Sequence, residues 1–244
     1  MRYLKNSLCS LGFFKVLNIN EDSIFVADAH FNSNRPELGK LLLQLLSGKI
    51  VTTQLFLMGD MFDFLSNEIR FYKIKNLKII ELLNQLSKKI DIVYLEGNHD
   101  FNIQILFPDI QVVPRQNQPL ICTYQDKQVA ISHGDIYTPT GYNIYTTIIR
   151  NSLFLNFLNF IDIRFWLSKK IDNWLLEKDI CNECQDFNSF ATNRISLYPK
   201  DIDIIIEGHF HYGQQSNNYI NIPSLACDKK YFQLNETFHS KTFV

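Results

Sequence analysis

Five short apolar runs along the chain have the composition of buried β-strands. They are rich in β-branched, aromatic and leucine residues, and most are bounded by a glycine or an acidic residue. The runs cover residues 23–27, 54–58, 91–95, 128–132 and 203–207. Between the first three runs, residues 36–46 and 67–89 place apolar side chains at helical spacing. Strands that alternate with helices predict parallel pairing through crossover helices.

Shorter apolar pieces beyond residue 100 predict further β-structure. They cover residues 110–113, 119–121, 129–132, 219–222 and 230–234. We expect them to form a second sheet region with more antiparallel pairing, so the predicted fold class is mixed α/β. At this length and with 46% hydrophobic residues, one domain over residues 1–244 is the simplest organisation. Within it we expect an N-terminal extension (1–20) and a helical insertion or cap (141–196).

The first part of this insertion, residues 141–176, is unusually aromatic. Between residues 153 and 167 only a narrow polar stripe interrupts the apolar positions, whereas a surface helix normally has an apolar stripe of limited width. Two interpretations fit this pattern. One is a helix buried between the core and another helix, the other is a cap that receives an acyl chain or docks on a membrane, and neither excludes the other. In the second case four basic residues would lie near phosphates or headgroups: Arg150, Arg164, Lys169 and Lys170.

Charge and hydropathy exclude some classes of function. A formal net charge of −1 gives no electrostatic case for a nucleic-acid partner, whose binders usually carry a basic stripe. No apolar run reaches the roughly 18 residues that suggest a membrane-spanning helix. The first residues lack the pattern of a secretion signal. We therefore expect a cytoplasmic protein that is soluble or peripheral on a membrane.

The five cysteines show no regular disulfide framework, which favours a reducing compartment. Cys181 and Cys184 have the spacing of half a zinc site or of a redox pair. No second Cys-x-x-Cys or His-x-x-x-His accompanies them, so we interpret them as incidental cysteines of a helix.

Each of the five predicted strands is followed by a short polar block, and these blocks hold five of the six histidines. The blocks are Asp28-Ala29-His30, Gly59-Asp60-Met61-Phe62-Asp63, Gly97-Asn98-His99-Asp100, His133-Gly134-Asp135 and Gly208-His209-Phe210-His211. Packing alone does not explain this concentration. Because open α/β sheets bind their ligands at the carboxyl ends of strands, we expect the five blocks to converge on one site.

The blocks have the composition of a site for two divalent metal ions. Carboxylate and amide oxygens suit Mg²⁺ or Mn²⁺, and imidazole extends the choice to Fe, Zn or Ni; we expect Mn²⁺. Two ions about 3.5 to 4 Å apart can generate hydroxide and neutralise phosphoryl oxygens. A carboxylate is the side chain best able to bridge two cations, and Asp60 is the candidate. The predicted chemistry is hydrolysis of phosphate esters or anhydrides.

Taken together and in this order, the blocks resemble the signature of the calcineurin-like metallophosphoesterase superfamily. The resemblance implies a four-layer αββα sandwich and assigns roles to the block residues. Asp28, His30 and His211 would hold one metal ion, Asn98, His133 and His209 the other, and Asp60 would bridge them. His99 would face the scissile phosphate as a proton donor, oriented by Asp100. Asp63 and Asp135 would form hydrogen bonds that fix the loops and ligands.

Within the superfamily, the chain resembles the bacterial UDP-2,3-diacylglucosamine pyrophosphatases of lipid A synthesis. That resemblance implies a peripheral enzyme on the cytoplasmic face of the inner membrane, whose insertion holds acyl chains. Candidate substrate contacts are Arg150, Trp166 and Asn102, with Arg115 and Tyr124 as further possibilities. One branch of that family has arginine at the position of His99 and a threonine followed by Arg-Pro in its last block. This chain has Phe210 and Tyr212-Gly213 instead, so it belongs to another branch or has another activity.

Two other functions compete with this one. The same chemistry could act on a soluble phosphomonoester, phosphodiester or phosphoprotein, in which case the aromatic insertion should be buried, with no apolar groove beside the metals. Alternatively, the fold could serve as a non-catalytic interaction scaffold. A scaffold is expected to lack several of the block residues, and none is missing here.

Overall fold

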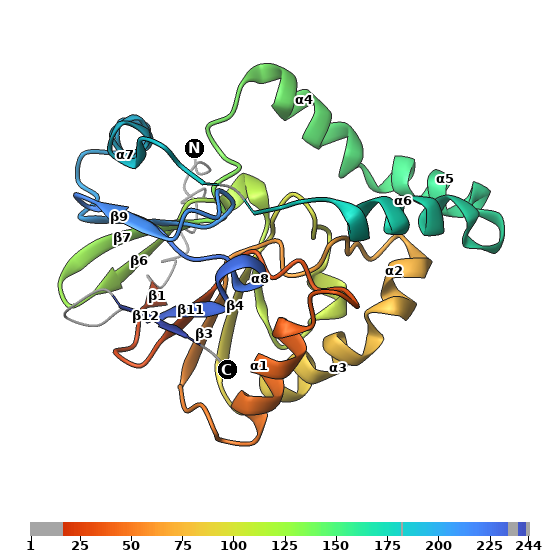
Figure 1. Cartoon of the computed structure of the whole chain (residues 1–244), viewed down its shortest axis with the longest axis horizontal. Helices are drawn as coiled ribbons and strands as arrows, with labels where there is room; N and C mark the ends of the chain where they lie inside the picture. Colours follow the sequence, from red (N-terminus) through yellow and green to blue (C-terminus); the bar gives the residue numbers. More distant parts are fainter. Residues whose placement is uncertain (1–16, 182, 234–238, 243–244) are drawn as a thin grey trace, which may run out of the picture.

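The computed structural model describes residues 17–181, 183–233 and 239–242, which contain two six-stranded sheets (Figure 1). The first sheet has the order β12-β11-β2-β3-β4-β5. Its parallel strands are β2 (Ile24–Val26), β3 (Gln54–Leu57), β4 (Asp91–Leu95) and β5 (Gln111–Val113). β11 (Lys230–Gln233) pairs antiparallel with β2, and β12 (His239–Thr242) pairs antiparallel with β11.

The second sheet has the order β1-β6-β7-β8-β10-β9. β7 (Lys127–Ser132), β8 (Ile204–Glu207) and β10 (Tyr219–Asn221) run parallel, whereas β6 (Leu120–Tyr124) pairs antiparallel with β7 and β9 (Gln214–Ser216) pairs antiparallel with β10. β1 (Leu17–Asn18) pairs with β6, so the predicted N-terminal extension reaches this sheet, while residues 1–16 lie outside the described part.

Alternating side chains of the strands form separate cores and so create four layers. In β3, Leu55 and Leu57 pack with α1 (Glu37–Leu46) and α3 (Leu77–Leu86), whereas Phe56 lies in the core between the sheets. In β8, Ile205 packs with α7 (Phe187–Ile195), while its neighbours contribute to the core between the sheets. Because successive side chains of a strand point to opposite faces, each sheet buries apolar residues on both sides. The arrangement is the αββα sandwich implied by the resemblance.

Two local predictions are corrected by the structure. The single helix expected over residues 67–89 is divided into α2 (Arg70–Lys75) and α3 at Asn76, whose side chain donates to the Phe64 carbonyl at 3.3 Å. Such side-chain bonds compete with the helical backbone bonds. The pieces at 110–113 and 230–234 form β5 and β11 of the first sheet, not part of the second. A short apolar run does not encode which strand it will pair with.

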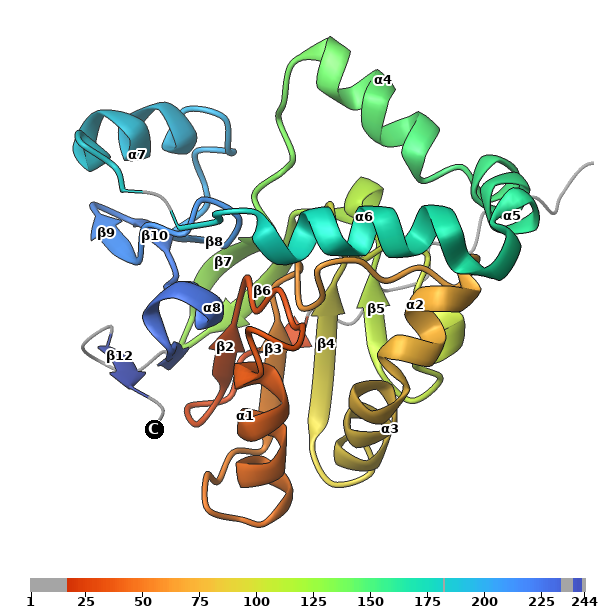
Figure 2. The ribbon, with the colours of Figure 1, turned by 45° about the vertical axis from the view of Figure 1, so that its right-hand side comes forward.

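The helices α4 (Thr140–Ile149), α5 (Ser152–Ile161) and α6 (Trp166–Glu177) project to one side of the sheets, and α6 runs above the ends of β4 and β5 (Figure 2). We call these three helices the α4–α6 cap. In α5 only Leu155 is buried, whereas Phe160 is 83% exposed. The interpretation of this helix as buried between core and neighbour is therefore wrong. Across the described ranges, no helix has the length and apolar character needed to cross a membrane.

Polar contacts fasten the cap to the sandwich. Lys75 of α2 forms an ion pair with Asp172 of α6, and the hydroxyl of Tyr72 donates to the Ser168 carbonyl at 3.4 Å. The loop after β2 contributes Arg35, which donates to the Leu175 carbonyl at 3.1 Å. The cap is thus held along α6, and Leu155 of α5 packs with Tyr72 and Phe101, while much of the rest of α5 faces solvent.

The remaining short helices are η1 (Gln104–Leu106), η2 (Arg115–Asn117), η3 (Ile163–Phe165) and α8 (Leu225–Asp228). The cysteine prediction is wrong in two respects. Cys181 and Cys184 lie in the connection between α6 and α7 and not in a helix, and Cys181 forms a disulfide with Cys227 of α8. The two cysteines are 46 residues apart, so local spacing could not reveal the pair.

Candidate metal centre

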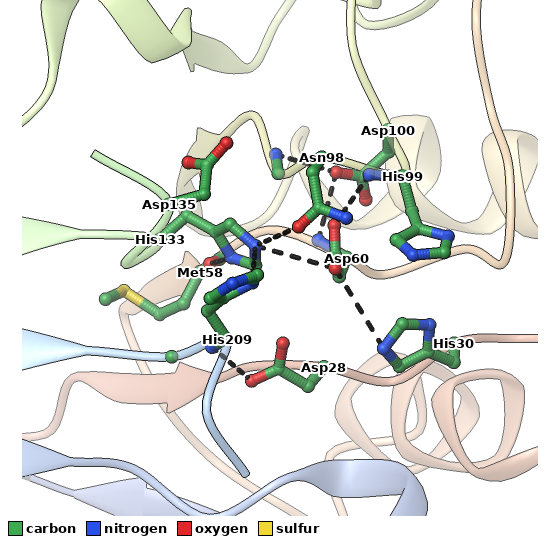
Figure 3. Close-up of polar contacts among 12 residues, drawn as sticks. Asp28, His30, Met58, Asp60, Asn98, His99, Asp100, His133, Asp135 and His209 are labelled. Carbon is green, nitrogen blue, oxygen red and sulfur yellow. Dashed lines mark hydrogen bonds and ion pairs between the residues drawn. The ribbon is translucent and has the colours of Figure 1, made fainter. Parts of the chain in front are cut away.

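The predicted ligands come from loops that directly follow five strands, and the structure brings them together at the carboxyl ends of those strands (Figure 3). Asp28 and His30 follow β2, Asp60 follows β3, Asn98 follows β4, His133 follows β7, and His209 and His211 follow β8. Both sheets therefore contribute ligands, and the site lies where the carboxyl ends of their strands meet.

Three overlapping groups of side chains have ligand atoms within 4.8 Å of one another. They are Asp28, His30 and His211; His30, Asp60 and His99; and Asp60, His133 and His209. The first group is one of the two predicted ligand sets, and the third combines His133 and His209 of the other set with the predicted bridge Asp60. Oδ2 of Asp60 lies 4.0 Å from Nε2 of His30 and 3.5 Å from Nε2 of His133. This carboxylate is therefore placed between the two sets, as a bridging ligand requires.

The donor atoms fit divalent ions. Oδ1 of Asp28 is buried and, within the described structure, has no hydrogen-bond partner; it lies 3.3 Å from Nε2 of His211. Oδ1 of Asn98 lies 3.2 Å from Nε2 of His133, which in turn lies 3.2 Å from Nδ1 of His209. These two imidazole nitrogens and the amide oxygen therefore converge on one point of the site. A cation would satisfy all of them.

The backbone of the site is strained where the ligands are attached. Five of the seven predicted ligands have a positive φ angle: 52° at Asp28, 40° at His30, 55° at Asp60, 67° at His209 and 61° at His211. Positive φ is uncommon outside glycine and typically costs about 1–3 kcal/mol when the surroundings enforce it. Such strain clusters at functional sites, where the backbone must turn sharply to aim several side chains at one point.

Two glycines allow the loops to approach one another closely. A Cβ atom at Gly97 would lie 2.2 Å from Oδ1 of Asp60, and one at Gly59 would lie 2.5 Å from Nδ1 of His133. Gly59 also has a φ of 88°. Both positions therefore require glycine for steric reasons, and any side chain there would displace a predicted ligand.

The protonation equilibria reflect a dense cluster of opposite charges. Burial alone would raise the pKa of Asp60, but the neighbouring imidazoles of His133 and His99 hold it well below its usual range. Burial alone would lower the pKa of His133, yet the Asp60 carboxylate raises it to about 10. Burial, reinforced by His133, lowers the pKa of His209 to about 4. Metal ions displace protons from such ligands, so metal binding here is expected to release protons.

Contacts on the outer side of the ligands fix the orientation of the rings. Nδ1 of His133 donates to the Met58 carbonyl at 2.8 Å, which leaves Nε2 for the centre. Oδ2 of Asp28 accepts from the backbone N–H of His209 at 2.8 Å and so joins the loops after β2 and β8. Arg35 donates to Asp63 at 2.8 and 3.0 Å and to the His30 carbonyl at 3.2 Å. Sequence reasoning missed these partners, because a carbonyl group carries no residue signature.

The acidic residues of the blocks do not all have the predicted contacts. Asp100 was expected to orient His99, but its carboxylate accepts from the N–H groups of Asp60 and Gly97 at 3.0 and 2.9 Å and from the Tyr94 hydroxyl at 2.6 Å. The Asp63 carbonyl instead accepts from Nδ1 of His99 at 2.6 Å. Asp100 is therefore a loop anchor, which corrects its predicted role.

Asp135 holds the loop after β7 through two arginines. Its Oδ2 lies 2.9 Å from Nε of Arg115 and 3.3 Å from Nη2 of Arg150. Arg150 also donates to the Gly97 carbonyl at 2.7 Å, directly before Asn98. These contacts agree with the expectation that Asp135 fixes a loop, and they place both arginines beside the candidate metal centre.

The candidate substrate contacts are separated in space. Arg150 and Asn102 lie together, because the Asn102 amide donates to the Arg150 carbonyl at 2.9 Å, and both line a polar cavity of about 580 Å³ that also includes Arg115. Trp166 begins α6, is 68% exposed and contacts Lys170 through its ring. Tyr124 lines a different cavity, at the opposite ends of the strands beside Asn18 and Asp22. The structure therefore brings together only part of this set.

A cavity of about 270 Å³ opens directly onto the candidate ligands. Its lining includes His30, Asp60, Asn98, His99, His209 and His211. The other side of this cavity is formed by Lys178, Asp179 and Ile180, which follow α6. These three residues were not among the predicted site residues, and their position beside the metal centre follows only from the course of the cap.

Comparison with known proteins agrees with this geometry. A family model described as calcineurin-like phosphoesterase matches residues 23–213. The chain belongs to this family. Among curated relatives, the UDP-2,3-diacylglucosamine hydrolase of Histophilus somni is 25% identical over 203 residues, which cover 78% of this chain and 83% of the relative. The protein of the same name from Hamiltonella defensa is 23% identical over 215 residues, 85% and 84% of the two chains.

A solved structure of the phosphoesterase Yfce from E. coli is also similar, with 13% identity, 88% of each chain covered and a TM-score of 0.43. The family match over residues 23–213 makes the chain described here a metal-dependent phosphoesterase, and its own fold is mixed α/β. When bound, a pair of divalent ions supplies a hydroxide nucleophile at neutral pH and neutralises charge on the phosphoryl oxygens. The chain itself would supply the ligands from the five loops, and His99 lines the cavity beside them.

Proposed function

We propose that this phosphoesterase hydrolyses the pyrophosphate bond of UDP-2,3-diacylglucosamine and releases UMP and 2,3-diacylglucosamine 1-phosphate. The observation that carries the proposal is an exposed apolar cap beside a candidate two-metal centre. A soluble substrate would leave the apolar surface of the cap without a role. The names of the relatives from H. somni and H. defensa support the same reaction.

An apolar cavity in the cap is suited to the acyl chains. It has a volume of about 160 Å³, and its lining is almost entirely apolar: Phe64, Ile69, Tyr145, Ile149, Phe154 and Leu155 are among the residues that form it. It can hold part of one chain, and the remainder would lie on exposed side chains of α5 such as Phe157.

The acyl cavity is linked to the reacting centre through one loop. Phe64, in the wall of the cavity, directly follows Asp63, whose carbonyl accepts from His99. An acyl chain seated against Phe64 would therefore position the attached sugar phosphate near the candidate ions. Binding energy from a remote apolar group used in this way orients the reacting bond.

The polar cavity on the other side suits the nucleoside. Its lining combines two arginines, Arg115 and Arg150, with two acidic residues, Glu68 and Glu96. This balance favours a neutral group with many hydrogen-bonding atoms, such as uracil and ribose, over a second phosphate. Asn102 adds an amide, which can both donate to and accept from a base.

His99 is proposed as the proton donor to the leaving oxygen. Since Nδ1 donates to the Asp63 carbonyl, Nε2 is left for the cavity that His99 lines. Burial lowers the pKa of His99, which disfavours the cationic form in the free protein. A bound pyrophosphate would add negative charge nearby and shift the pKa upward, so that the acid forms when the substrate is present.

The same cap is proposed to dock on the cytoplasmic face of a membrane, which would give the enzyme access to its lipid substrate. Leu153, Phe160 and Ile163 are 81%, 83% and 75% exposed. Arg164, Lys169 and Lys170 are exposed nearby and could contact anionic headgroups. In a sedimentation assay at low salt, the protein should pellet with vesicles of anionic phospholipid. A smaller fraction should pellet with neutral vesicles.

The deciding experiment compares two substrates with the same purified protein and Mn²⁺. One arm uses UDP-2,3-diacylglucosamine in detergent micelles and detects UMP by chromatography. The other uses bis(4-nitrophenyl) phosphate, which has neither acyl chain nor uridine. We expect a much higher kcat/KM for the lipid nucleotide. Hydrolysis of the simple ester alone would contradict the lipid substrate and leave the phosphoesterase chemistry intact.

A further inference from the structure

The disulfide between Cys181 and Cys227 lies against the candidate metal centre. Nε2 of His211 faces Asp28 at 3.3 Å, and on the other side of the ring Nδ1 lies 3.8 Å from Sγ of Cys227. The same imidazole hydrogen-bonds to the backbone of Ile180, the residue directly before Cys181. The His211 ring therefore contacts Cys227 on one side of the disulfide link and, on the other, the residue that precedes Cys181.

The disulfide also joins the segment that follows α6, at the end of the cap, to α8. Lys178, Asp179 and Ile180 form one wall of the cavity over the ligands. On one side this wall is attached to Arg35, which bonds to the carbonyls of Leu175 and Lys178 at 3.1 and 3.5 Å. On the other side it is attached to α8 through the disulfide. The loop closed by Cys181 and Cys227 contains α7, β8 and both His209 and His211.

From this arrangement we propose that Cys181 and Cys227 are a reversible thiol–disulfide site that sets the affinity of the Asp28, His30 and His211 group for its metal ion. In the closed state, the His211 ring is held by the contact of its Nδ1 with Sγ of Cys227 and by the backbone of Ile180. In the open state, the segment after α6 is released from α8, and His211 loses this fixed partner. Partners on the outer side of a metal-bound histidine typically change metal affinity by about 10–100-fold.

The reaction partner is a small thiol or a protein dithiol. Its thiolate attacks Sγ of Cys181, which is the more exposed of the two cysteines, and the S–S bond breaks with Cys227 leaving as thiolate and taking up a proton. A second thiol attacks the mixed disulfide, so two thiols are oxidised to one disulfide while Cys181 and Cys227 are reduced by two electrons. A small disulfide reverses the sequence.

The proposed cytoplasmic location makes reversibility relevant. Cytosolic disulfides are usually transient, catalytic or redox-sensing, because glutathione and thioredoxin keep most thiols reduced. This step rests on that location, whereas the effect on metal affinity rests only on the contacts of His211. The two parts are therefore tested separately.

The test uses the full chain and Mn²⁺ alone, without substrate, so that its outcome is independent of the proposed reaction. Free Mn²⁺ is measured by electron paramagnetic resonance during titration of oxidised protein and of protein reduced with dithiothreitol and alkylated. We expect two sites in both states, with one of them about tenfold weaker after reduction. Alkylation followed by intact-mass measurement should count two more thiols in the reduced form.

Cys181→Ser is the decisive variant, because it opens the bond while leaving Cys227 beside His211. It should bind Mn²⁺ as the reduced protein does, whatever the redox state. Cys184→Ser is the matched control, since Cys184 is a free cysteine of the same connection, and it should retain the redox response. Equal affinity in oxidised, reduced and Cys181→Ser protein would overturn the coupling to the metal. A bond that stays closed at every ratio of reduced to oxidised glutathione would overturn its reversibility.

Discussion

The metal-binding loops and the α4–α6 cap bury opposite kinds of side chain. The loops bury charged and polar groups, including Asp28, Asp60 and His133, and support them with backbone hydrogen bonds. The cap exposes apolar groups such as Leu153 and Phe160. Both reverse the usual rule that apolar residues are inside and charged residues outside. This contrast agrees with the proposed function, in which the loops bind cations and the cap binds an apolar group.

The two regions also differ in what supports them. Each loop follows a parallel strand that is buried on both faces. These rigid strands enforce the positive φ angles at five of the predicted ligands. The cap has little core of its own and is attached through α6, through Leu155 of α5 and through Arg150 after α4. Substitutions in the loops should therefore affect chemistry on every substrate, whereas substitutions in the cap should affect only substrates that carry apolar groups.

The largest effect is expected at Asp60, which lies between the two ligand groups. Asp60→Asn removes one negative charge from both candidate ion sites, and kcat/KM should fall about 10³-fold on the lipid nucleotide and on the simple ester alike, since about 4 kcal/mol of transition-state stabilisation is lost. Bound Mn²⁺, measured by atomic absorption after dialysis, should fall below two per chain. Asp91→Asn is the control, because Asp91 is exposed at the start of β4. Full metal occupancy in Asp60→Asn would argue against the bridge.

Removal of His99 should preserve metal and depress turnover. In His99→Ala we expect a fall in kcat of about 10²-fold or more, because general acid catalysis typically contributes 10²–10⁴-fold. The loss should be smaller for bis(4-nitrophenyl) phosphate, whose leaving group needs little protonation. Metal content is measured on the same samples, and undiminished turnover would remove His99 from the mechanism.

The strands that support the loops should also differ from the cap in how much their side chains contribute to the free energy of unfolding. Leu57→Ala in β3 deletes a fully buried side chain and should lower the free energy of unfolding by about 2–5 kcal/mol. Leu153→Ala in α5 deletes one that is 81% exposed and should stay within about 0.5 kcal/mol. Urea denaturation of both proteins tests this. Similar losses would mean that α5 is stabilised by more than its visible contacts.

The smallest effect, about tenfold, is expected for the cap and should depend on the substrate. Phe154 lines the apolar cavity, whereas its neighbour Leu153 does not. Phe154→Ser should reduce kcat/KM for the lipid nucleotide about tenfold, since roughly 1.4 kcal/mol of apolar contact is lost, and should leave the simple ester unchanged. Leu153→Ser is the matched control in detergent micelles. An equal fall in kcat/KM on both substrates would contradict the view that the cap affects only substrates with apolar groups.

Much of this organisation could be predicted from the sequence. The five strands lie within one or two residues of the expected ranges, and α1 begins at Glu37 within the predicted 36–46. Buried strands and amphipathic helices repeat with periods of 2 and 3.6 residues, so local pattern reveals them. The blocks after the strands could then be assigned to one site, because parallel strands end at the same edge.

Other features depend on contacts between distant segments. The break at Asn76 depends on the Phe64 carbonyl, and the orientation of His99 depends on the Asp63 carbonyl and not on the adjacent Asp100. Neither acceptor is identifiable by residue type. Whether α5 is buried or exposed was also undecided, because an apolar helix has the same sequence in a core and in a cap.

The sequence alone thus determined the chemistry: which residues can hold metal ions, and that strand ends bring them together. Only the tertiary structure decided what surrounds them. It set Lys178 to Ile180 over the cavity, joined Cys181 to Cys227, and left α5 facing solvent. The physical reason is the distance along the chain over which each kind of interaction acts. Periodicity and turn chemistry act over a few residues, whereas the packing of α6, α8 and the loops is decided by contacts between residues tens of positions apart.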